Sequence, residues 1–258
     1  RGIISSSLSD KDESIYIYTK VTTNKGVAES CIRHSHANLL YVDVDGKRVY
    51  GSSDNERPGQ EPQKNAEELD QRNLNGLKME ELVDAVESID EEELRFLDGA
   101  VDVNIAAAEV GLKEKPGMGL GGGIEALIQD GVQGKSLLST VEKYVAAATD
   151  ARLSGQSIPI KGCGGSGTQG IAFFLGIGLA CKEYQDRLSK SLNRTLAMGL
   201  LLVQYIKGYT GLLTPTCGVT VSSAPAIAAS LVYAMGGTPG QMTMAVKIVI
   251  GNIAGILC

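Results

Sequence analysis

Charged residues are distributed very unevenly along the chain, and this constrains the fold more than any motif does. Of the 30 acidic residues, 21 fall within the first hundred positions, whereas residues 208–246 contain no charged residue at all. That stretch is long enough to cross a membrane, but glycine, serine, threonine and proline interrupt it throughout, as in Thr214-Pro215-Thr216. We therefore expect buried helices in the core of a globular protein and no membrane span.

Alternating side chains near the start of the chain indicate β-strands. Residues 14–23 alternate in the manner of a half-buried strand, with Ile15 and Ile17 on one side. The same signal recurs twice, and Asp45-Gly46 then marks a tight hairpin turn before a last short strand. We expect a small antiparallel sheet with strands at residues 14–23, 27–33, 37–44 and 47–50.

A change of pattern divides the chain into two predicted domains. Residues 51–72 are polar and carry two prolines, which is typical of a surface loop or linker. We expect a β-rich domain with its linker over residues 1–78 and a larger all-helical domain over residues 79–258. The predicted fold class is therefore α+β, with a small antiparallel β-sheet domain followed by a helical one.

The second predicted domain has the hydrophobic period of α-helices from Met79 onward. Asp90 followed by Glu93 is a capping pattern, and we expect it to begin one long helix that runs through Leu94 to Ile105. Further helices are expected at residues 136–152, 169–188, 192–206, 224–235 and 241–256.

The overall charge and the cysteines limit the function classes. A net charge of −6 argues against a nucleic acid or an anionic membrane as partner, so we expect a small molecule. The five cysteines are widely and irregularly spaced, which is unlike a secreted disulfide framework and favours the cytoplasm. Because the chain begins on Arg1 without a methionine, we interpret it as an internal piece of a longer protein, truncated at both ends.

A glycine-rich turn at residues 162–170 precedes an apolar helical run. Several backbone N–H groups can converge there, where a helix dipole favours an anion. Gly162, Gly164 and Gly167 satisfy a dinucleotide-binding pattern, but only the short segment 158–160, interrupted by a proline, could form the preceding strand. A carboxylate fits at least as well as a phosphate, and a plain turn between packed helices is the alternative.

Three of the cysteines, and Arg152 near the turn, have simpler interpretations. Cys31, Cys163 and Cys181 are expected to be buried packing residues, although Cys163 could be reactive within the turn. Arg152 either pairs with a carboxylate or serves the dipole of its own helix.

Three segments together resemble a known family. They are residues 146–152 (AAATDAR) leading to 165–171 (GSGTQGI), residues 214–218 (TPTCG), and residues 251–258 (GNIAGILC). In combination they are similar to the L-cysteine desulfidase family, which is related to the alpha part of iron-sulfur L-serine dehydratases. Weaker similarities at residues 36–39 and 98–104 extend the resemblance over most of the chain.

The resemblance implies an oxygen-sensitive four-iron four-sulfur (4Fe-4S) cluster held by three cysteines, with one iron open to the substrate. Cys217 and Cys258 match two of these ligands, and the third is expected a few residues after Cys258. The family's catalytic base, a cysteine, is expected before Arg1, so this 258-residue chain alone should be inactive. Donors to the substrate carboxylate are assigned to Ser166, Gly167, Thr168 and Gln169, with Thr168 standing where the family usually has asparagine.

The reaction implied is an α,β-elimination that converts L-cysteine to pyruvate, ammonia and sulfide. Serine or another β-substituted amino acid is the alternative substrate. Two other classes stay open, a nucleotide-binding enzyme that uses residues 162–170 and a binding protein without a cluster. No motif places a lysine as a pyridoxal phosphate anchor. A second copy of the chain, or a complementary chain that supplies the missing parts, is left undecided.

Overall fold

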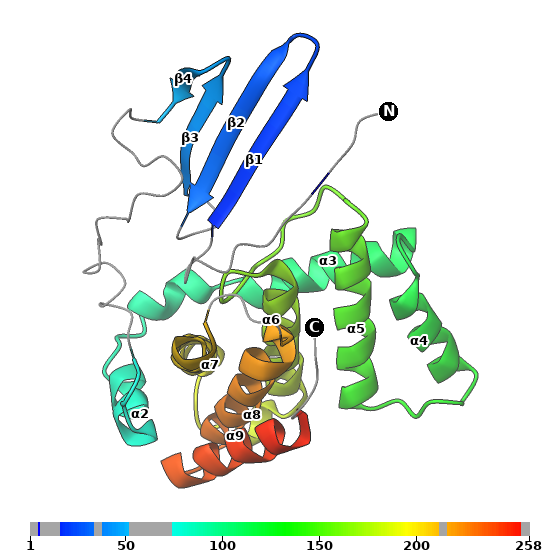
Figure 1. The fold of residues 1–258 in the computed structure, drawn as a ribbon. Helices are drawn as coiled ribbons and strands as arrows, with labels where there is room; N and C mark the ends of the chain where they lie inside the picture. The colour runs from blue at the N-terminus through cyan, green and yellow to red at the C-terminus, as the bar shows by residue number, and fades with distance from the viewer. Residues whose placement is uncertain (1–4, 6–15, 34–37, 52–73, 212–215, 254–258) are drawn as a thin grey trace. The chain divides into compact units, whose positions relative to one another are not determined.

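The protein is described by a computed structural model that covers residues 5, 16–33, 38–51, 74–211 and 216–253. The chain divides into two compact units, Arg1–Ala66 and Glu67–Cys258. Strands form the first unit and helices the second (Figure 1), which confirms the predicted α+β fold class. The predicted linker at residues 51–72 lies almost wholly outside the described residues, so the predicted domain boundary stays a prediction.

The first unit contains a four-stranded antiparallel sheet in the order β1-β2-β3-β4. The Asp45-Gly46 turn has the left-handed backbone that such hairpins require, with φ of 50° and 76°. The Asp45 carboxylate also accepts a hydrogen bond of 2.7 Å from the Val27 N–H, which ties this turn to the neighbouring strand. Cys31 and Tyr41 pair across β2 and β3, and both are 3% exposed. The strands are β1 (Tyr16–Thr23), β2 (Gly26–Arg33), β3 (Leu39–Val44) and β4 (Lys47–Tyr50).

The second unit is a helical bundle built around one central helix, α6. Apolar residues lie on all sides of α6, and such a helix is stable only when other helices surround it. It contacts α3, α5, α7 and α8 (Figure 1), and Phe173, Phe174 and Ile177 on it are at most 1% exposed. The α-helices are α2 (Met79–Glu87), α3 (Ala100–Glu114), α4 (Leu120–Gln129), α5 (Leu137–Leu153), α6 (Gly167–Glu183), α7 (Leu192–Thr210), α8 (Ala224–Ala234) and α9 (Pro239–Ile253).

One helix prediction was wrong, and one helix was missed. The long helix expected from Asp90 to Ile105 is a short 3-10 helix, Glu93–Leu97, followed by α3. The two are separated at Gly99, whose φ of 68° belongs to left-handed backbone that cannot continue an α-helix. Helix α4 was not predicted, because its first turn is rich in glycine, the weakest helix former after proline.

The long uncharged stretch forms several short elements. It includes the last turn of α7, a π-helical turn at Val219–Ser223, α8 and the first half of α9. Over the residues that the structure describes, no helix has both the length and the hydrophobicity needed to cross a membrane.

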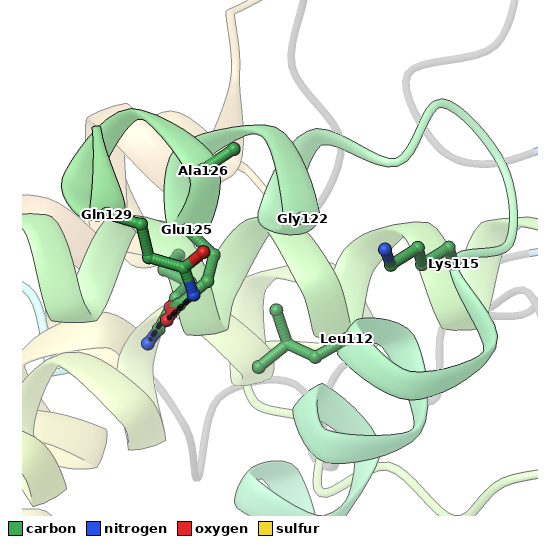
Figure 2. A pocket seen from close by; sticks show the side chains of 7 residues that line it. Leu112, Lys115, Gly122, Glu125, Ala126 and Gln129 are labelled. Carbon is green, nitrogen blue, oxygen red and sulfur yellow. Dashed lines mark hydrogen bonds and ion pairs between the residues drawn. The ribbon is translucent and has the colours of Figure 1, made fainter. Parts of the chain in front are cut away.

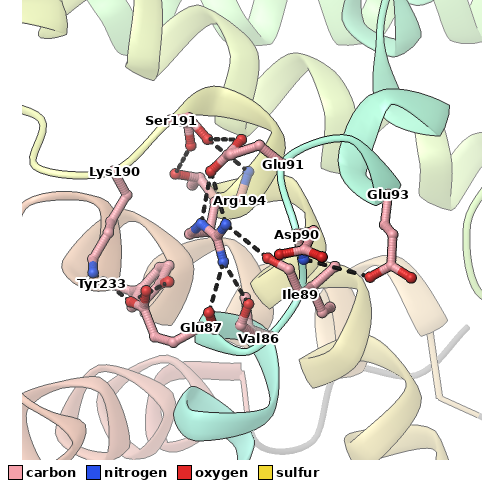
Figure 3. Close-up of polar contacts among 11 residues, drawn as sticks. Val86, Glu87, Ile89, Asp90, Glu91, Glu93, Lys190, Ser191, Arg194 and Tyr233 are labelled. Atoms are coloured by element: carbon pink, nitrogen blue, oxygen red, sulfur yellow. Dashed lines mark hydrogen bonds and ion pairs between the residues drawn. The ribbon is translucent and has the colours of Figure 1, made fainter.

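Arg194 joins the end of α2 to the start of α7 (Figure 3). Its guanidinium donates hydrogen bonds to the carbonyls of Val86, at 2.6 Å, and Ile89, at 2.9 Å, and to the Glu91 carboxylate at 2.8 Å. Carbonyls at the end of a helix have no partner within it, so the arginine satisfies acceptors that burial would otherwise leave unpaired. The Arg194 side chain is only 11% exposed, which makes these bonds a fixed part of the structure.

Replacement of Arg194 should therefore destabilise the helical unit. We expect Arg194→Ala to lower the free energy of unfolding by about 2 kcal/mol, because charge-assisted hydrogen bonds to buried acceptors are lost. Arg95→Ala is the matched control, since Arg95 pairs with Glu92 on the surface with both side chains well exposed, and should change stability by less than about 0.5 kcal/mol. Urea unfolding of both variants checks this, and equal losses would contradict it.

A second polar contact makes stability depend on pH. The Glu87 carboxylate accepts hydrogen bonds from Lys190 and, at 2.7 Å, from the Tyr233 hydroxyl, and these hold its pKa below the ordinary 4.5. A lowered pKa means that the folded state favours the ionised form, so this contribution is complete above 4.5 and is lost as pH falls through the lowered value.

The melting temperature of wild type should accordingly exceed that of Glu87→Gln at pH 7, and the difference should shrink between pH 5 and pH 3. Glu109→Gln, on an exposed part of α3, is the control and should show no such trend. A difference between wild type and Glu87→Gln that stays constant down to pH 3 would count against this role of Glu87.

Candidate functional site

The glycine-rich turn is a tight two-residue hairpin that leads directly into α6. Cys163 and Ser166 exchange two backbone hydrogen bonds, of 3.0 and 3.2 Å, around Gly164 and Gly165. These two glycines have φ of 55° and 79°, a geometry that side chains disfavour. Residues 156–162, which precede the turn, form neither strand nor helix, so the strand that a dinucleotide-binding motif requires is absent at this place in the described chain.

Ser166 caps the first turn of α6 with its side chain. Its hydroxyl accepts a hydrogen bond of 3.3 Å from the Gln169 N–H, and its carbonyl accepts one of 3.1 Å from the Gly170 N–H. Among the residues described, no acceptor lies within hydrogen-bonding reach of the Gly167 and Thr168 N–H groups. Two backbone donors therefore remain at the positive end of a 17-residue helix, an arrangement that suits a carboxylate.

Asn104 on α3 fixes the segment before the turn. It is fully buried, and its amide donates to the Lys161 and Gly170 carbonyls at 3.1 and 3.2 Å while accepting from the Lys161 N–H at 3.1 Å. Helix α6 approaches this segment so closely that a Cβ on Gly170 would lie 2.2 Å from the Lys161 carbonyl oxygen. The start of α6 is thus held by backbone contact as well as by side chains.

Gln169 connects the turn to the segment that contains Cys217. It is 1% exposed, and its amide nitrogen donates a 2.7 Å hydrogen bond to the Ser222 hydroxyl. Ser222 in turn donates to the Gly218 carbonyl at 2.7 Å, and a Cβ on Gly218 would lie 3.2 Å from the Gln169 amide oxygen. The structure therefore brings the predicted carboxylate-binding residues next to the residue that follows Cys217 in the chain.

Cys217 lies immediately before the π-helical turn and is half-buried. Hydrogen bonds from the Thr220 backbone and hydroxyl, and from the Val219 backbone, lower the pKa of the Cys217 thiol despite partial burial. A lowered pKa favours the thiolate, which is the form that binds iron-sulfur clusters. The donor chemistry of Cys217 therefore fits the implied cluster.

The described residues do not by themselves form a metal site. Within the described part of the chain, no three His, Cys, Asp or Glu side chains lie close enough to hold a metal ion. Cys258 falls outside the described residues, so its pairing with Cys217 stays a prediction. Cys31, Cys163 and Cys181 are buried, as expected for packing residues. Burial raises the pKa of Cys163 to about 11, so this thiol is protonated and unreactive at neutral pH.

Two basic side chains reach the turn from other helices. Lys207 on α7 is 9% exposed, and its Cε lies 2.8 Å from where a Cβ of Gly164 would be. Burial lowers the pKa of Lys207. Arg152 at the end of α5 donates a 2.9 Å hydrogen bond to the Thr168 hydroxyl. Sequence reasoning missed Lys207, although it is the one charged residue between positions 195 and 246.

Two surface pockets lie elsewhere on the helical unit. One, of about 340 Å³, lies between α3, α4 and α5, where Glu125 pairs with Lys143 and Lys115 extends past Gly122 (Figure 2). Another, of about 410 Å³, lies between the first turn of α3, the end of α6 and the start of α7. None of the predicted site residues lines either pocket, so the candidate site is defined by the contacts around the turn.

Comparison with known proteins gives a family match. The model of the serine dehydratase alpha chain family matches residues 16–258. A UPF0597 protein of Clostridioides difficile is 31% identical over 249 residues, which cover 96% of this chain and 57% of that protein. A UPF0597 protein of Desulforapulum autotrophicum is 30% identical over 254 residues, which cover 97% of this chain and 56% of that protein. The chain thus spans little more than half the length of these relatives, and no solved structure matches it.

The close approach at Gly170 gives a direct test of how the turn is held. Gly170→Ala should destabilise the helical unit by about 3 kcal/mol, because the new Cβ would meet backbone atoms that cannot move aside without breaking the Asn104 contacts. Gly123→Ala in α4 is the matched control, since nothing lies within 4 Å of its Cβ, and should stabilise by about 0.5–1 kcal/mol. Thermal unfolding measures both. A Gly170→Ala variant as stable as wild type would show that the approach is looser than described.

Proposed function

Because the chain belongs to the serine dehydratase alpha chain family, we propose that the complete protein is an iron-sulfur-dependent lyase acting on a β-substituted amino acid. The proposed substrate is L-cysteine, which would give pyruvate, ammonia and sulfide. L-serine is the alternative substrate. The family supports elimination chemistry, and the choice of cysteine rests on the resemblance of residues 165–171, 214–218 and 251–258 to cysteine desulfidases.

One observation carries this proposal, the chain of hydrogen bonds from Gln169 through Ser222 to Gly218. These contacts run between the start of α6, where the open donors lie, and the segment that contains Cys217. An elimination of this kind needs both features, a group that holds the substrate carboxylate and a metal site near the leaving group. The residues lie 53 positions apart in the chain, so their contact is a property of the fold.

Cys217 would hold the cluster together with Cys258 and a third cysteine. When bound, such a cluster supplies an open iron that acts as a Lewis acid. The residues of this chain would bind and orient the substrate. The Gly167 and Thr168 N–H groups would donate to its carboxylate, and the capping bond from Gln169 to Ser166 would keep these donors aligned. The base that removes the α-proton is not assigned within this chain.

The other function classes have less support. A nucleotide-binding enzyme would need a strand before the glycine-rich turn, and residues 156–162 have none. A binding protein without a cluster is less favoured, because the hydrogen bonds that lower the pKa of Cys217 favour the thiolate, the form that binds a cluster. We propose that the enzyme is cytoplasmic, where its thiols would stay reduced, and Cys163, Cys181 and Cys217 have free thiols.

The test uses the complete protein, purified without oxygen and supplied with L-cysteine or L-serine. We expect sulfide and pyruvate from L-cysteine, and loss of bound iron and of activity in Cys217→Ser, because a serine hydroxyl is a poor cluster ligand. Cys181→Ala, which alters a buried cysteine in the core, is the control and should keep its iron.

Three other outcomes have distinct meanings. Pyruvate from serine alone would retain the lyase and change the substrate. A protein that contains iron but turns over neither amino acid would contradict the proposed substrates, and a protein without iron would contradict the proposed cofactor.

A further inference from the structure

Arg152 reaches from the last turn of α5 onto the first turn of α6. Its Nη1 donates a 2.9 Å hydrogen bond to the Thr168 hydroxyl. A Cβ on Gly167 would lie 2.4 Å from the Arg152 Nε and 3.0 Å from the centre of the guanidinium. The guanidinium thus occupies space that is free only because residue 167 is glycine.

This placement leaves a positive charge without a counter-ion. The start of a helix is the positive end of its dipole, so a cation there is unfavourable unless an anion lies beside it. No described acidic residue forms an ion pair with Arg152. Asp150, two residues earlier, instead accepts a 2.8 Å hydrogen bond from the Leu120 N–H at the start of α4. Arg152 also lies at the negative end of the α5 dipole, which favours a cation. That attraction is opposed by the positive end of the α6 dipole.

A second cation lies at the other end of the same turn. Lys207 is more than nine-tenths buried, with its Cε against Gly164. Burial of an ammonium group costs free energy, which is consistent with the lowered pKa of Lys207. Two positive side chains from α5 and α7 therefore converge on a turn that also offers the backbone donors of Gly167 and Thr168.

We propose that Arg152 binds the carboxylate of the amino-acid substrate at the start of α6, and that the Thr168 hydroxyl holds the guanidinium in position. This inference rests on the proposed function and adds a residue to its binding site. A guanidinium presents a planar fork of donors that matches a carboxylate, and one arm of this fork is already fixed by Thr168. The anion is a carboxylate and not a nucleotide phosphate, because the turn lacks the preceding strand of a dinucleotide site.

The test compares variants of the complete, iron-loaded protein. Arg152→Gln should raise KM for the substrate about 10- to 100-fold and leave kcat within about threefold, because a contact to the non-reacting carboxylate is lost equally in the ground and transition states. Arg152→Lys should restore only part of the loss, since it keeps the charge without the fork. Thr168→Val, which removes the hydroxyl and keeps the shape, should have a smaller effect of the same kind.

Gly167→Ala is a second variant that leaves Arg152 intact. The added methyl group meets only the end of the flexible Arg152 side chain, so the protein should fold and the guanidinium should be displaced. It should therefore reproduce the rise in KM of Arg152→Gln. Arg95→Gln, on the surface 3-10 helix, is the control and should match wild type.

A binding measurement separates this inference from the proposed function. L-Alanine has the carboxylate but no leaving group at Cβ, and L-alaninamide lacks the carboxylate. Anaerobic calorimetry should show that Arg152→Gln weakens binding of L-alanine about 10- to 100-fold and leaves binding of L-alaninamide unchanged. Iron content and melting temperature should stay at wild-type values.

Each other result has one interpretation. An active wild type whose KM and alanine affinity are unaffected by Arg152→Gln would overturn the role of Arg152 alone. Equal weakening of alanine and alaninamide, or loss of iron, would show a structural role and also overturn it. A wild type that binds alanine through Arg152 but turns over no β-substituted amino acid would refute the proposed function and retain the carboxylate contact. A wild type that neither reacts nor binds alanine would overturn both.

Discussion

The close backbone approach between Gly170 and the Lys161–Gly162 segment is the contact on which the rest of the candidate site depends. It is possible only because Gly170 lacks a side chain, and the buried amide of Asn104 satisfies polar groups that the approach removes from water. Because Asn104 on α3 holds both Lys161 and Gly170, the turn between them is fixed relative to α3. Ser166 then caps the helix, and Gln169 is directed into the interior toward Ser222.

Much of the fold was predictable because its signals are local. Strand alternation, the Asp45-Gly46 turn and the helical period of α5 to α9 each depend on residues within one element. The failures occurred where glycine decided the outcome. Gly99 interrupts a hydrophobic pattern that continues without change on both sides of it, so periodicity alone indicated one long helix. Helix α4 begins with low helix propensity and is stabilised by its packing against α5, which sequence reasoning did not see.

The candidate site was predicted in part, for the same physical reason. The glycine-rich turn and Cys217 belong to short segments with a recognisable pattern. Asn104, Lys207 and Ser222 lie on other elements, and only the three-dimensional packing brings them to the turn. One signal for Lys207 was present, since a single charge within a long apolar stretch must have a reason to be buried. No comparable signal marked Asn104 or Ser222, because buried amides and hydroxyls are common in packed cores.

Two arginines lie against the first turns of helices, and they differ in whether an acidic side chain balances their charge. Arg194, in the first turn of α7, has carbonyls of the preceding helix end and the Glu91 carboxylate around it, so its charge is balanced within the protein. Arg152, at the start of α6, has the Thr168 hydroxyl and no acidic partner among the described residues. The first turn of α6 is half-buried, and in such a partly desolvated place a charge interacts more strongly with an anion than it does on the open surface. The packing that fixes the start of α6 therefore also fixes the guanidinium and the backbone donors to which a carboxylate would bind.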